Sequence, residues 1–292
     1  MKEYHSKCLV CRSDRIFPLK GYERHNLVKC KNCGFVFQRV NPTAEELESH
    51  YHSYSYDKEH YISPVTIKSY NNLLDEFEKF RQTNKILDVG CGLGFFLETA
   101  KQRGWETEGI EYSKKAIEIC KEKGIKVHES SFNLNDFEGK PFDVITSFEV
   151  IEHINHPVEE LNAIKALLRK GGLFYCTTPN FNCYLRYLLK DRYNIIEYPE
   201  HLSYYTKSTL NKVITDRGFL KYKFLCTGIS ISRWRSSTGK SEGSLSVENS
   251  ADEILRKKIE EKWYLTFVKK VLNKLLTLTG TGMTLKGYYI NK

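Results

Sequence analysis

The sequence predicts an α/β fold built around a mostly parallel sheet. Three short runs, KILDV, FDVITSF and GGLFYCTTPN, have the β-branched and aromatic composition of buried strands. Two of them lead into helical patterns, FFLETAKQR and PVEELNAIKALLRK, the second opened by Pro157. Strands that alternate with helices are typical of doubly wound α/β proteins, whose ligands bind beyond the carboxyl ends of the strands.

Length and composition indicate a soluble, cytoplasmic globular protein. The 292 residues are 40% hydrophobic, enough to bury a sizeable core, and the start MKEYHSKC has no signal-peptide pattern. No apolar run reaches the roughly 18 residues of a membrane span. The net charge of +9 is concentrated in residues 1–40 and 251–292, so the central region is not a basic surface for a polyanion such as nucleic acid.

A glycine-rich turn follows the first of these strands. Gly90, Gly92 and Gly94 form G-C-G-L-G, and Glu111 ends the next short strand, WETEGIE. Glycines let the backbone approach a ligand, and the following helix offers free amides. A carboxylate about 20 residues further on, at the tip of the next strand, is where a ribose diol is held. The pattern predicts a nucleoside cofactor, with an ordinary strand-to-helix turn as the alternative.

The spacing of these glycines differs from the dinucleotide pattern G-x-G-x-x-G. With Asp88 before it, the stretch resembles the D-x-G-x-G-x-G signature of class I S-adenosylmethionine (SAM) methyltransferases. The resemblance implies a Rossmann-like seven-stranded sheet, with Asp88 toward the methionyl end of SAM, Glu111 toward the ribose and Tyr112 toward the adenine. Cys91 is expected to be a small packing residue. The predicted cofactor-binding set is Asp88, Gly90, Cys91, Gly92, Gly94, Glu111, Tyr112, Ser147 and Phe148.

The end of the strand FDVITSF is expected to carry the chemistry. If the chain turns helically there, Glu149, Glu152 and His153 share one face at i, i+3 and i+4. That face would present either a general base or a site for a divalent ion. The string E-V-I-E-H resembles small-molecule methyltransferases, including the ubiquinone-biosynthesis O-methyltransferases. The alternative is that these residues only stabilise a surface turn.

The segment EYPEHLSYYTKSTL is expected to face the acceptor. Tyr198, His201, Tyr204 and Tyr205 form a cluster that can stack on and hydrogen-bond a ring substrate. The string H-L-S-Y-Y-T resembles a segment of methyltransferases from polysaccharide and sugar biosynthesis. His153 is the first candidate for the general base and His201 the second, with a purely structural role as the alternative for His201.

Two cysteine pairs mark the front of the chain. Cys8-x2-Cys11 and Cys30-x2-Cys33 have the spacing of a four-thiolate structural zinc site, and a segment this short needs a metal for stability. We predict a zinc ribbon at 1–40 and a connector with lid helices at 41–82, including a helix from Val65 to Phe80. Tyr51, Tyr54, Tyr56 and Tyr61 would close over the site or pack the ribbon onto the core.

The order of these segments resembles a broad family of bacterial zinc-ribbon methyltransferases, which includes sugar C-methyltransferases, over residues 8–226. The methyltransferase core is predicted at 83–228, a linker with an amphipathic helical insertion at 229–280 and the final strand at 281–292. One helix, 252–276, has Tyr264, Phe267 and Leu275 on one side and Lys262, Lys269 and Asn273 on the other. Its basic face would lie on the inner membrane face, or the helix would pack on the protein or a second subunit.

The predicted function is methyl transfer from SAM to a sugar, a nucleotide-linked sugar or a related small-molecule acceptor. Whether oxygen, carbon or nitrogen is methylated stays open. An RNA base methyltransferase is the first alternative, because zinc ribbons also precede such enzymes, but the near-neutral core argues against nucleic acid. A non-catalytic SAM-binding or zinc-ribbon adaptor is the second.

Overall fold

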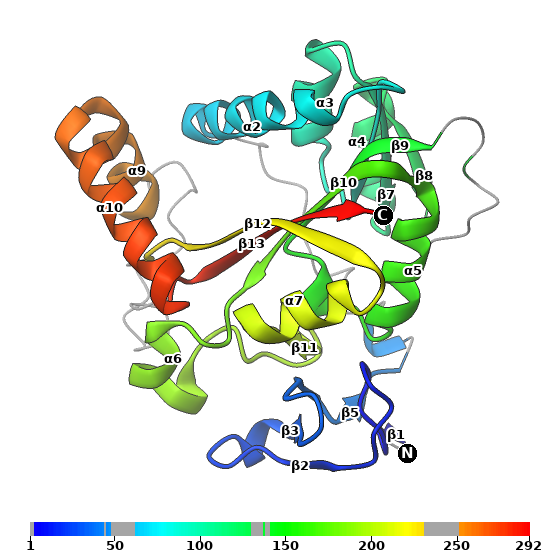
Figure 1. The fold of residues 1–292 in the computed structure, drawn as a ribbon, viewed down its shortest axis with the longest axis vertical. Coiled ribbons are helices and arrows are strands. Elements are labelled where there is room, and N and C mark those ends of the chain that lie inside the picture. Colours follow the sequence, from blue (N-terminus) through cyan, green and yellow to red (C-terminus); the bar gives the residue numbers. More distant parts are fainter. Residues whose placement is uncertain (1–2, 44, 48–61, 130–136, 138–140, 231–250) are drawn as a thin grey trace.

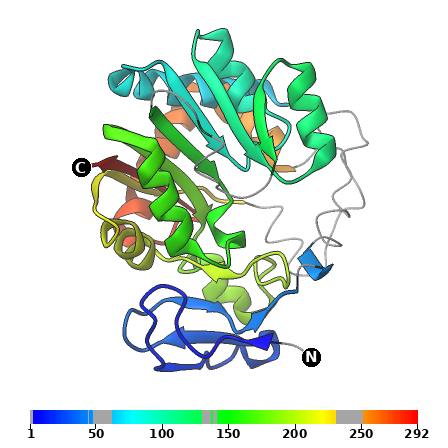
Figure 2. The same cartoon turned by 90° about the vertical axis from the view of Figure 1, so that its right-hand side faces the viewer.

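A computed structural model of the chain describes residues 3–43, 45–47, 62–129, 137, 141–230 and 251–292. It confirms the predicted α/β fold. A seven-stranded sheet lies at the centre with helices on both faces, and a small β-ribbon lies at one end (Figures 1 and 2). The four tyrosines of the predicted lid and the segment 231–250 lie outside the described residues.

The central sheet has the strand order β12-β13-β10-β9-β6-β7-β8. Its strands are β6 (Lys85–Val89), β7 (Glu106–Glu111), β8 (Lys126–Glu129), β9 (Phe142–Phe148), β10 (Leu168–Pro179), β12 (Phe219–Thr227) and β13 (Thr284–Asn291). β13 runs antiparallel to β10 and β12, while β6 pairs in parallel with β7 and β9. The chain order reverses at β6, and such a switch point opens a crevice at the carboxyl ends of the strands.

Side-chain alternation along the strands separates two helical layers. Leu173 and Tyr175 of β10 belong to one core cluster, whereas Phe174 and Cys176 belong to the other, as the two-residue period of a strand requires. The first cluster includes side chains of α2 (Pro64–Phe77), α3 (Phe95–Gln102) and α4 (Lys114–Glu122). The second includes side chains of α5 (Pro157–Leu167) and α7 (Lys207–Thr215).

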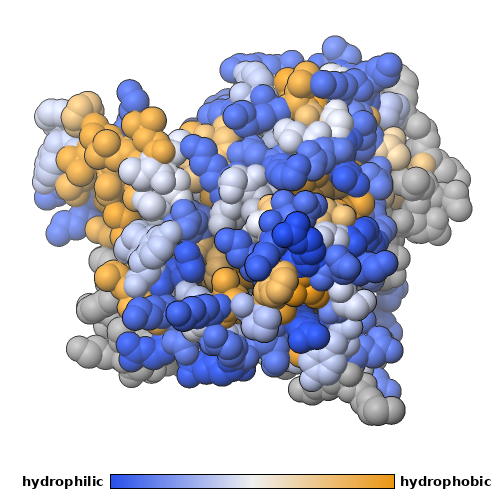
Figure 3. All heavy atoms as spheres, turned by 60° about the horizontal axis from the view of Figure 1, so that its bottom comes forward, coloured by the Kyte–Doolittle hydropathy of each residue, from blue (hydrophilic) through white to orange (hydrophobic). Residues whose placement is uncertain are grey.

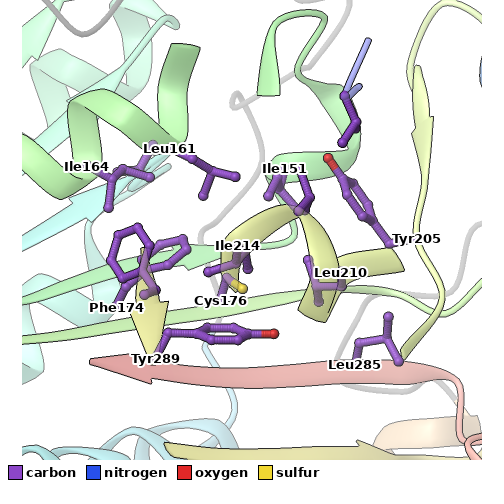
Figure 4. Close-up of a cluster of buried hydrophobic side chains, with 14 of the residues drawn as sticks. Ile151, Leu161, Ile164, Phe174, Cys176, Tyr205, Leu210, Ile214, Leu285 and Tyr289 are labelled. Carbon is purple, nitrogen blue, oxygen red and sulfur yellow. The ribbon is translucent and has the colours of Figure 1, made fainter. Parts of the chain in front are cut away.

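Figure 4 shows the second cluster, in which β10 and β13 meet α5 and α7. The drawn side chains are apolar apart from the hydroxyls of Tyr205 and Tyr289 and the thiol of Cys176. The labelled members are Ile151, Leu161, Ile164, Phe174, Cys176, Tyr205, Leu210, Ile214, Leu285 and Tyr289. Ile151 and Tyr205 of this cluster are close in sequence to residues of the site described below, so packing of the cluster fixes the backbone that carries the site.

The ribbon consists of short antiparallel strands and is joined to the core by backbone pairing. β1 (Glu3–Tyr4) pairs with β5 (Val40–Asn41), and β2 (Ile16–Pro18), β3 (Leu27–Cys30) and β4 (Val36–Gln38) form a sheet. The fourth strand of that sheet, β11 (Ser203–Tyr204), comes from the core and pairs with β4. The backbone amide of Gln38 also donates to the Leu202 carbonyl at 2.8 Å. The ribbon is therefore continuous with the H-L-S-Y-Y-T segment.

The predicted single helix over 252–276 is wrong: α9 (Ala251–Glu261) and α10 (Trp263–Thr279) form a hairpin that projects from the body (Figure 1). Lys262 between them has an extended backbone, with φ −117° and ψ 112°. α9 is tied to the α2 region, where Ser63 donates to Glu253 and Lys68 pairs with Glu260 at 2.7 Å, while α10 lies along β12. None of the helices in the described residues is long and apolar enough to cross a membrane.

Candidate active site

The glycine-rich turn joins β6 to α3 in left-handed backbone conformations. Gly90, Gly92 and Gly94 have φ values of 67°, 51° and 74°. A Cβ atom on Gly90 would lie 2.5 Å from Val150 Cγ2, and one on Gly94 would lie 2.8 Å from Cys120 Sγ. Within the described part of the chain, a Cβ on Gly92 would meet nothing within 4 Å. Packing therefore demands the outer two glycines, while the middle one leaves room for a ligand.

Asp88 lies at the carboxyl end of β6 with its side chain only 2% exposed. Its Oδ1 atom accepts a hydrogen bond of 2.6 Å from the Thr146 hydroxyl of the neighbouring strand β9. Burial raises the pKa of Asp88 to about 7; the bond from Thr146 opposes that rise and the nearby Glu111 carboxylate adds to it. A buried acid poised between its two charge states is well suited to receive a cationic ligand group.

Glu111 at the end of β7 holds the turn in place. Its Oε2 atom accepts from the Gly92 amide at 2.8 Å, and its Oε1 atom accepts from the amides of Tyr112 and Ser113 at 2.8 and 2.9 Å. A carboxylate has about four acceptor positions, so these three bonds leave one for a ribose hydroxyl. Tyr112 follows with its side chain 54% exposed beside this carboxylate. The arrangement is compatible with the roles expected for both residues.

Cys91 occupies the turn as a packing residue, as expected. Its side chain is buried, and a Cβ atom on Gly109 of β7 would lie 2.6 Å from its Sγ atom. The close approach of Cys91 therefore requires glycine at position 109. Cys120 of α4 closes the other side of the turn and donates to the Gly92 carbonyl at 3.3 Å. Neither Gly109 nor Cys120 was identified from the sequence, because both act through contacts between distant segments.

Ser147 and Phe148 at the end of β9 point to opposite faces of the sheet, and Phe148 belongs to an aromatic cluster. Ser147 is buried, and among the described residues its Oγ atom has no hydrogen-bond partner. The Phe148 ring lies 4.9 Å from that of Phe96, 5.5 Å from that of Tyr175 and 6.0 Å from that of Tyr70. Phe148 is therefore part of this cluster, and its contact with the cofactor stays a prediction.

Tyr70 of α2 contacts the rings of Phe96 and Phe148, which the sequence did not reveal. Burial raises its pKa to about 12; the carboxylate of Asp88 adds to the rise and Arg256 of α9 opposes it. Tyr70 therefore lies within the electrostatic range of both the cofactor turn and the hairpin. Its only sequence signal is its position on a helix that covers the first strand of the sheet.

Lys286 of β13 lies near the carboxyl end of the neighbouring strand β10, close to Glu149. Burial lowers its pKa, the carboxylate of Glu149 opposes that shift, and Lys269 and Arg256 of the hairpin reinforce it. The β10–β13 register places Lys286 opposite Thr177, whose carbonyl and hydroxyl accept from the Glu149 amide at 3.0 and 3.2 Å. A lysine beside a carboxylate at the carboxyl end of the sheet was not expected from the sequence.

The expected helical face of Glu149, Glu152 and His153 does not form. The 3₁₀ helix begins only at Ile151, and Glu149 has a left-handed backbone with φ 53°. Its amide donates to Thr177 at the end of β10, which keeps Glu149 in the bend directly after β9 rather than on the helix. Glu149 is therefore not part of the group of possible metal ligands that includes Glu152 and His153.

That group is completed by His201. Ligand atoms of Glu152, His153 and His201 lie within 4.8 Å of one another. The Glu152 side chain is buried, its Oε2 atom accepts from the Thr178 hydroxyl at 2.9 Å, and its Oε1 atom lies 3.9 Å from His153 Nε2. The two imidazole rings lie edge to face. The structure thus joins the two histidines that the sequence offered as alternative bases.

In both histidines, a backbone carbonyl accepts a hydrogen bond from Nδ1. His153 Nδ1 donates to the Glu200 carbonyl and His201 Nδ1 to the Ile195 carbonyl, each at 2.6 Å. A carbonyl oxygen only accepts, so the proton of each neutral ring is on Nδ1 and the lone pair is on Nε2. A neutral imidazole with its lone pair directed into a site can accept a proton or coordinate a metal.

The tyrosines near His201 do not form the expected platform for a ring substrate. Tyr204 and Tyr205 are 3% and 0% exposed, because Tyr204 lies in β11 and Tyr205 packs on Phe35 of the ribbon. Tyr198 donates to Glu46 at 2.9 Å. Tyr204 and Tyr205 therefore serve the junction between the ribbon and the core.

The four ribbon cysteines converge on one point. Cys8 Sγ lies 3.5 Å from Cys33 Sγ, Cys11 Sγ lies 3.6 Å from Cys30 Sγ, and the four sulfur atoms lie within 4.8 Å of one another. A zinc ion with bonds of about 2.3 Å to four tetrahedral thiolates would set sulfur atoms about 3.8 Å apart. The geometry and the soft donor set both fit zinc.

The sheet order, the glycine turn and the two acidic strand ends define a class I SAM-dependent methyltransferase. A family model described as a methyltransferase domain (methyltransferase-23) matches residues 59–222, more than half of the chain. The chain belongs to this methyltransferase family.

Several curated relatives are ubiquinone biosynthesis O-methyltransferases. The enzyme of Haemophilus ducreyi is 33% identical over 107 residues, 33% of this chain and 45% of its own length. That of Azoarcus sp. is 34% identical over 113 residues, 35% of this chain and 47% of its own. The matched region thus spans about half the length of these relatives.

Solved structures share the fold. A SAM-dependent methyltransferase from Archaeoglobus fulgidus has a TM-score of 0.52 at 18% identity, covering 77% of this chain and 93% of its own. A putative sarcosine dimethylglycine methyltransferase from Galdieria sulphuraria has a TM-score of 0.53 at 14% identity, covering 84% and 97%. At these identities the likeness concerns the fold alone.

Proposed function

We propose that the enzyme methylates a hydroxyl group on the ring of a small-molecule acceptor, with His153 as the general base. The observation that carries this proposal is the pair of imidazoles whose Nε2 lone pairs are directed into one site beside the buried Glu152. A hydroxyl must lose its proton as it is methylated, and a neutral imidazole is the natural acceptor near neutral pH. The O-methyltransferases among the relatives support transfer to oxygen.

The enzyme's residues act by positioning and by moving one proton. The sulfonium of SAM supplies an electrophilic methyl group. Asp88 and Glu111 would hold the donor at the ends of β6 and β7, with the turn shaped by the bond from the Gly92 amide to Glu111. His153 would take the acceptor proton at Nε2 while the Glu200 carbonyl keeps Nδ1–H in place, and the Glu152 carboxylate at 3.9 Å would stabilise the resulting imidazolium.

The same cluster is also suited to a divalent ion. A carboxylate and two imidazoles with backbone-held Nδ1–H groups are typical donors for zinc, manganese or iron(II), while magnesium prefers oxygen donors. We place this site at Glu152, His153 and His201 in place of the set containing Glu149. When bound, the ion would occupy the Nε2 lone pair of His153, so it would replace that histidine as base and lower the pKa of a coordinated hydroxyl instead. Manganese titration followed by electron paramagnetic resonance, with Glu152→Gln as the control, tests it.

Zinc in the ribbon is a second part of the proposal. Four thiolates saturate the ion, so its role would be structural, and it would stabilise a segment whose own core is small. The RNA methyltransferase alternative has no support from the site, whose walls contain Glu149 and Glu152 close to the place of the acceptor. Steep salt dependence of RNA binding would favour that alternative.

Methyl transfer from labelled SAM to a panel of acceptors tests the proposal. The panel contains nucleotide-linked sugars, free sugars and hydroxylated phenols, each beside its deoxy analogue. We expect label on a hydroxyl of one class and none on the deoxy analogue. The sugar arm tests the expectation from H-L-S-Y-Y-T, and the phenol arm tests the function named for the relatives. Label on carbon, or on RNA alone, would contradict the proposal.

A further inference from the structure

Helix α10 exposes a continuous apolar face to solvent. Trp263, Phe267 and Leu278 are 81%, 62% and 70% exposed, and among the described residues α10 has no buried side chain. The outer face consists of Trp263, Tyr264, Phe267, Val268, Val271, Leu275 and Leu278. Figure 3 shows apolar atoms gathered on the projecting lobe at the upper left, where Figure 1 places the hairpin. An exposed patch of this kind usually marks an interaction site.

Polar groups on the inward side of the same helix form hydrogen bonds with the protein. Asn273 Oδ1 accepts from the Gly228 amide at 3.1 Å, and the Thr277 hydroxyl donates to the Cys226 carbonyl at 3.0 Å. Lys207 donates to the Thr277 carbonyl at 3.0 Å. An amphipathic helix of a globular protein normally turns its apolar face inward. In α10 the inward side combines these polar groups with the half-buried Leu265, Leu272 and Leu276, while the most exposed apolar side chains point outward. Asn273, which we expected on the membrane side, therefore meets the protein instead.

The charge on α10 indicates what covers the apolar face. The helix carries Lys269, Lys270 and Lys274 and no acidic residue. At about 3.6 residues per turn, Lys270 and Lys274 lie along one border of the face, next to Trp263 and Phe267. Lysines that border an apolar stripe with a tryptophan and a tyrosine at one end are typical of helices lying in the headgroup region of an anionic bilayer.

A second copy of the chain fits this surface less well. Two copies pairing through the outer face would bring the Lys270 and Lys274 borders close together, and like charges oppose such pairing. The acids of the hairpin give little compensation: Glu260 is paired with Lys68 and Lys269, Glu253 with Arg256, and the exposed Glu261 lies at the turn. We propose that α10 docks the enzyme on an anionic lipid surface with its apolar face inserted at the headgroup level.

Co-sedimentation of the full chain with vesicles tests the proposal. Vesicles of phosphatidylcholine with phosphatidylglycerol are compared with phosphatidylcholine alone at low and high salt. We expect pelleting with the anionic vesicles that weakens with salt. Trp263→Ser/Phe267→Ser/Leu278→Ser should abolish pelleting, and Lys270→Gln/Lys274→Gln should weaken it on the order of tenfold. These side chains are exposed, so the fold should survive, which circular dichroism verifies.

Matched substitutions elsewhere serve as controls. Tyr187→Ser/Leu188→Ser removes two apolar side chains that are 56% and 66% exposed on α6 (Tyr184–Leu189). Lys114→Gln/Lys121→Gln removes two exposed lysines on α4. Both control variants should pellet like the parent.

Absence of pelleting of the parent protein, or equal pelleting of the parent and the triple variant, would overturn the proposal. A dimer of the parent in sedimentation velocity that becomes a monomer in the triple variant would also overturn the proposal, because a second copy would then cover the face. The inference does not depend on which acceptor is methylated.

Discussion

The imidazole rings of His153 and His201 lie 4.8 Å apart between ring centroids at an interplanar angle of 62°. They come from different segments, the 3₁₀ helix after β9 and the loop before β11. That loop supplies the Glu200 carbonyl that holds His153, and its Leu202 amide donates to the Glu152 carbonyl at 2.9 Å. One loop therefore assembles the whole Glu152, His153 and His201 cluster.

Replacing either histidine should impair turnover without affecting the donor site. We expect His153→Ala to lower kcat by about 10²- to 10⁴-fold, because the acceptor proton loses its base. His201→Ala should lower it by a smaller factor if His201 only orients the acceptor. The Kd for SAM should stay within about twofold in both variants, since the glycine turn is intact. Stopped assays with the acceptor found above, together with calorimetry for SAM, measure both quantities.

His156→Ala is the matched control for these variants. His156 precedes α5, is exposed, and makes no side-chain cap hydrogen bond. The kcat of His156→Ala should equal that of the parent. Unchanged turnover in both His153→Ala and His201→Ala would rule out the proposed base.

The state of Asp88 should make SAM binding depend on pH. Its pKa is raised to about 7 in the free enzyme, so the carboxylate is protonated below that pH. If the carboxylate receives the ammonium of SAM, the Kd should be constant above about pH 7 and rise tenfold per unit below it. Asp88→Asn should bind weakly with this dependence removed. Thr146→Val, which removes the hydrogen bond that lowers the pKa, should move the midpoint upward. A parent Kd independent of pH between 5.5 and 8 would contradict this role.

The glycines of the turn should respond differently to the same substitution. Gly94→Ala adds a Cβ atom 2.8 Å from Cys120 Sγ and 2.9 Å from Ile125 Cδ1 at a φ of +74°. Backbone strain and overpacking together should lower the free energy of unfolding by about 2–4 kcal/mol. Among the described residues the Cβ of Gly92→Ala meets nothing within 4 Å, so only the strain of about 1–2 kcal/mol applies. SAM affinity should still fall, because the new methyl occupies the ligand's side. Urea denaturation and SAM calorimetry separate the two effects; equal SAM affinity in Gly92→Ala would contradict the assignment.

Local patterns predicted the sheet and the cofactor turn, and long-range geometry determined the rest. The glycine spacing and the acids at 88 and 111 are readable from sequence because strand, turn and helix follow one another directly. The pairing of His153 with His201 depends on the path of the loop before β11, which no local period encodes. Glu149 does not lie on the expected face because its amide donates hydrogen bonds to Thr177 of β10. Periodicity revealed the two sides of α10 but not which one faces the protein.

The ribbon should influence catalysis through its shared sheet. β4 pairs with β11, and the Gln38 amide donates to the carbonyl of Leu202, next to His201. Cys8→Ser/Cys33→Ser removes two of the four thiolates, so we expect loss of bound zinc in mass-spectrometric metal analysis. Because β11 then loses its partner strand, kcat should fall at least tenfold while the Kd for SAM changes little.

Cys226→Ala is the control for this last prediction, because it removes a buried thiol in the core without touching the four ribbon cysteines. It should retain the zinc of the parent. Hydrogen exchange at the amides of 201–205 gives a readout besides activity, since these amides should lose protection only in the ribbon variant. If zinc is lost while exchange at 201–205 and kcat both stay at parent values, the ribbon has no positioning role for His201.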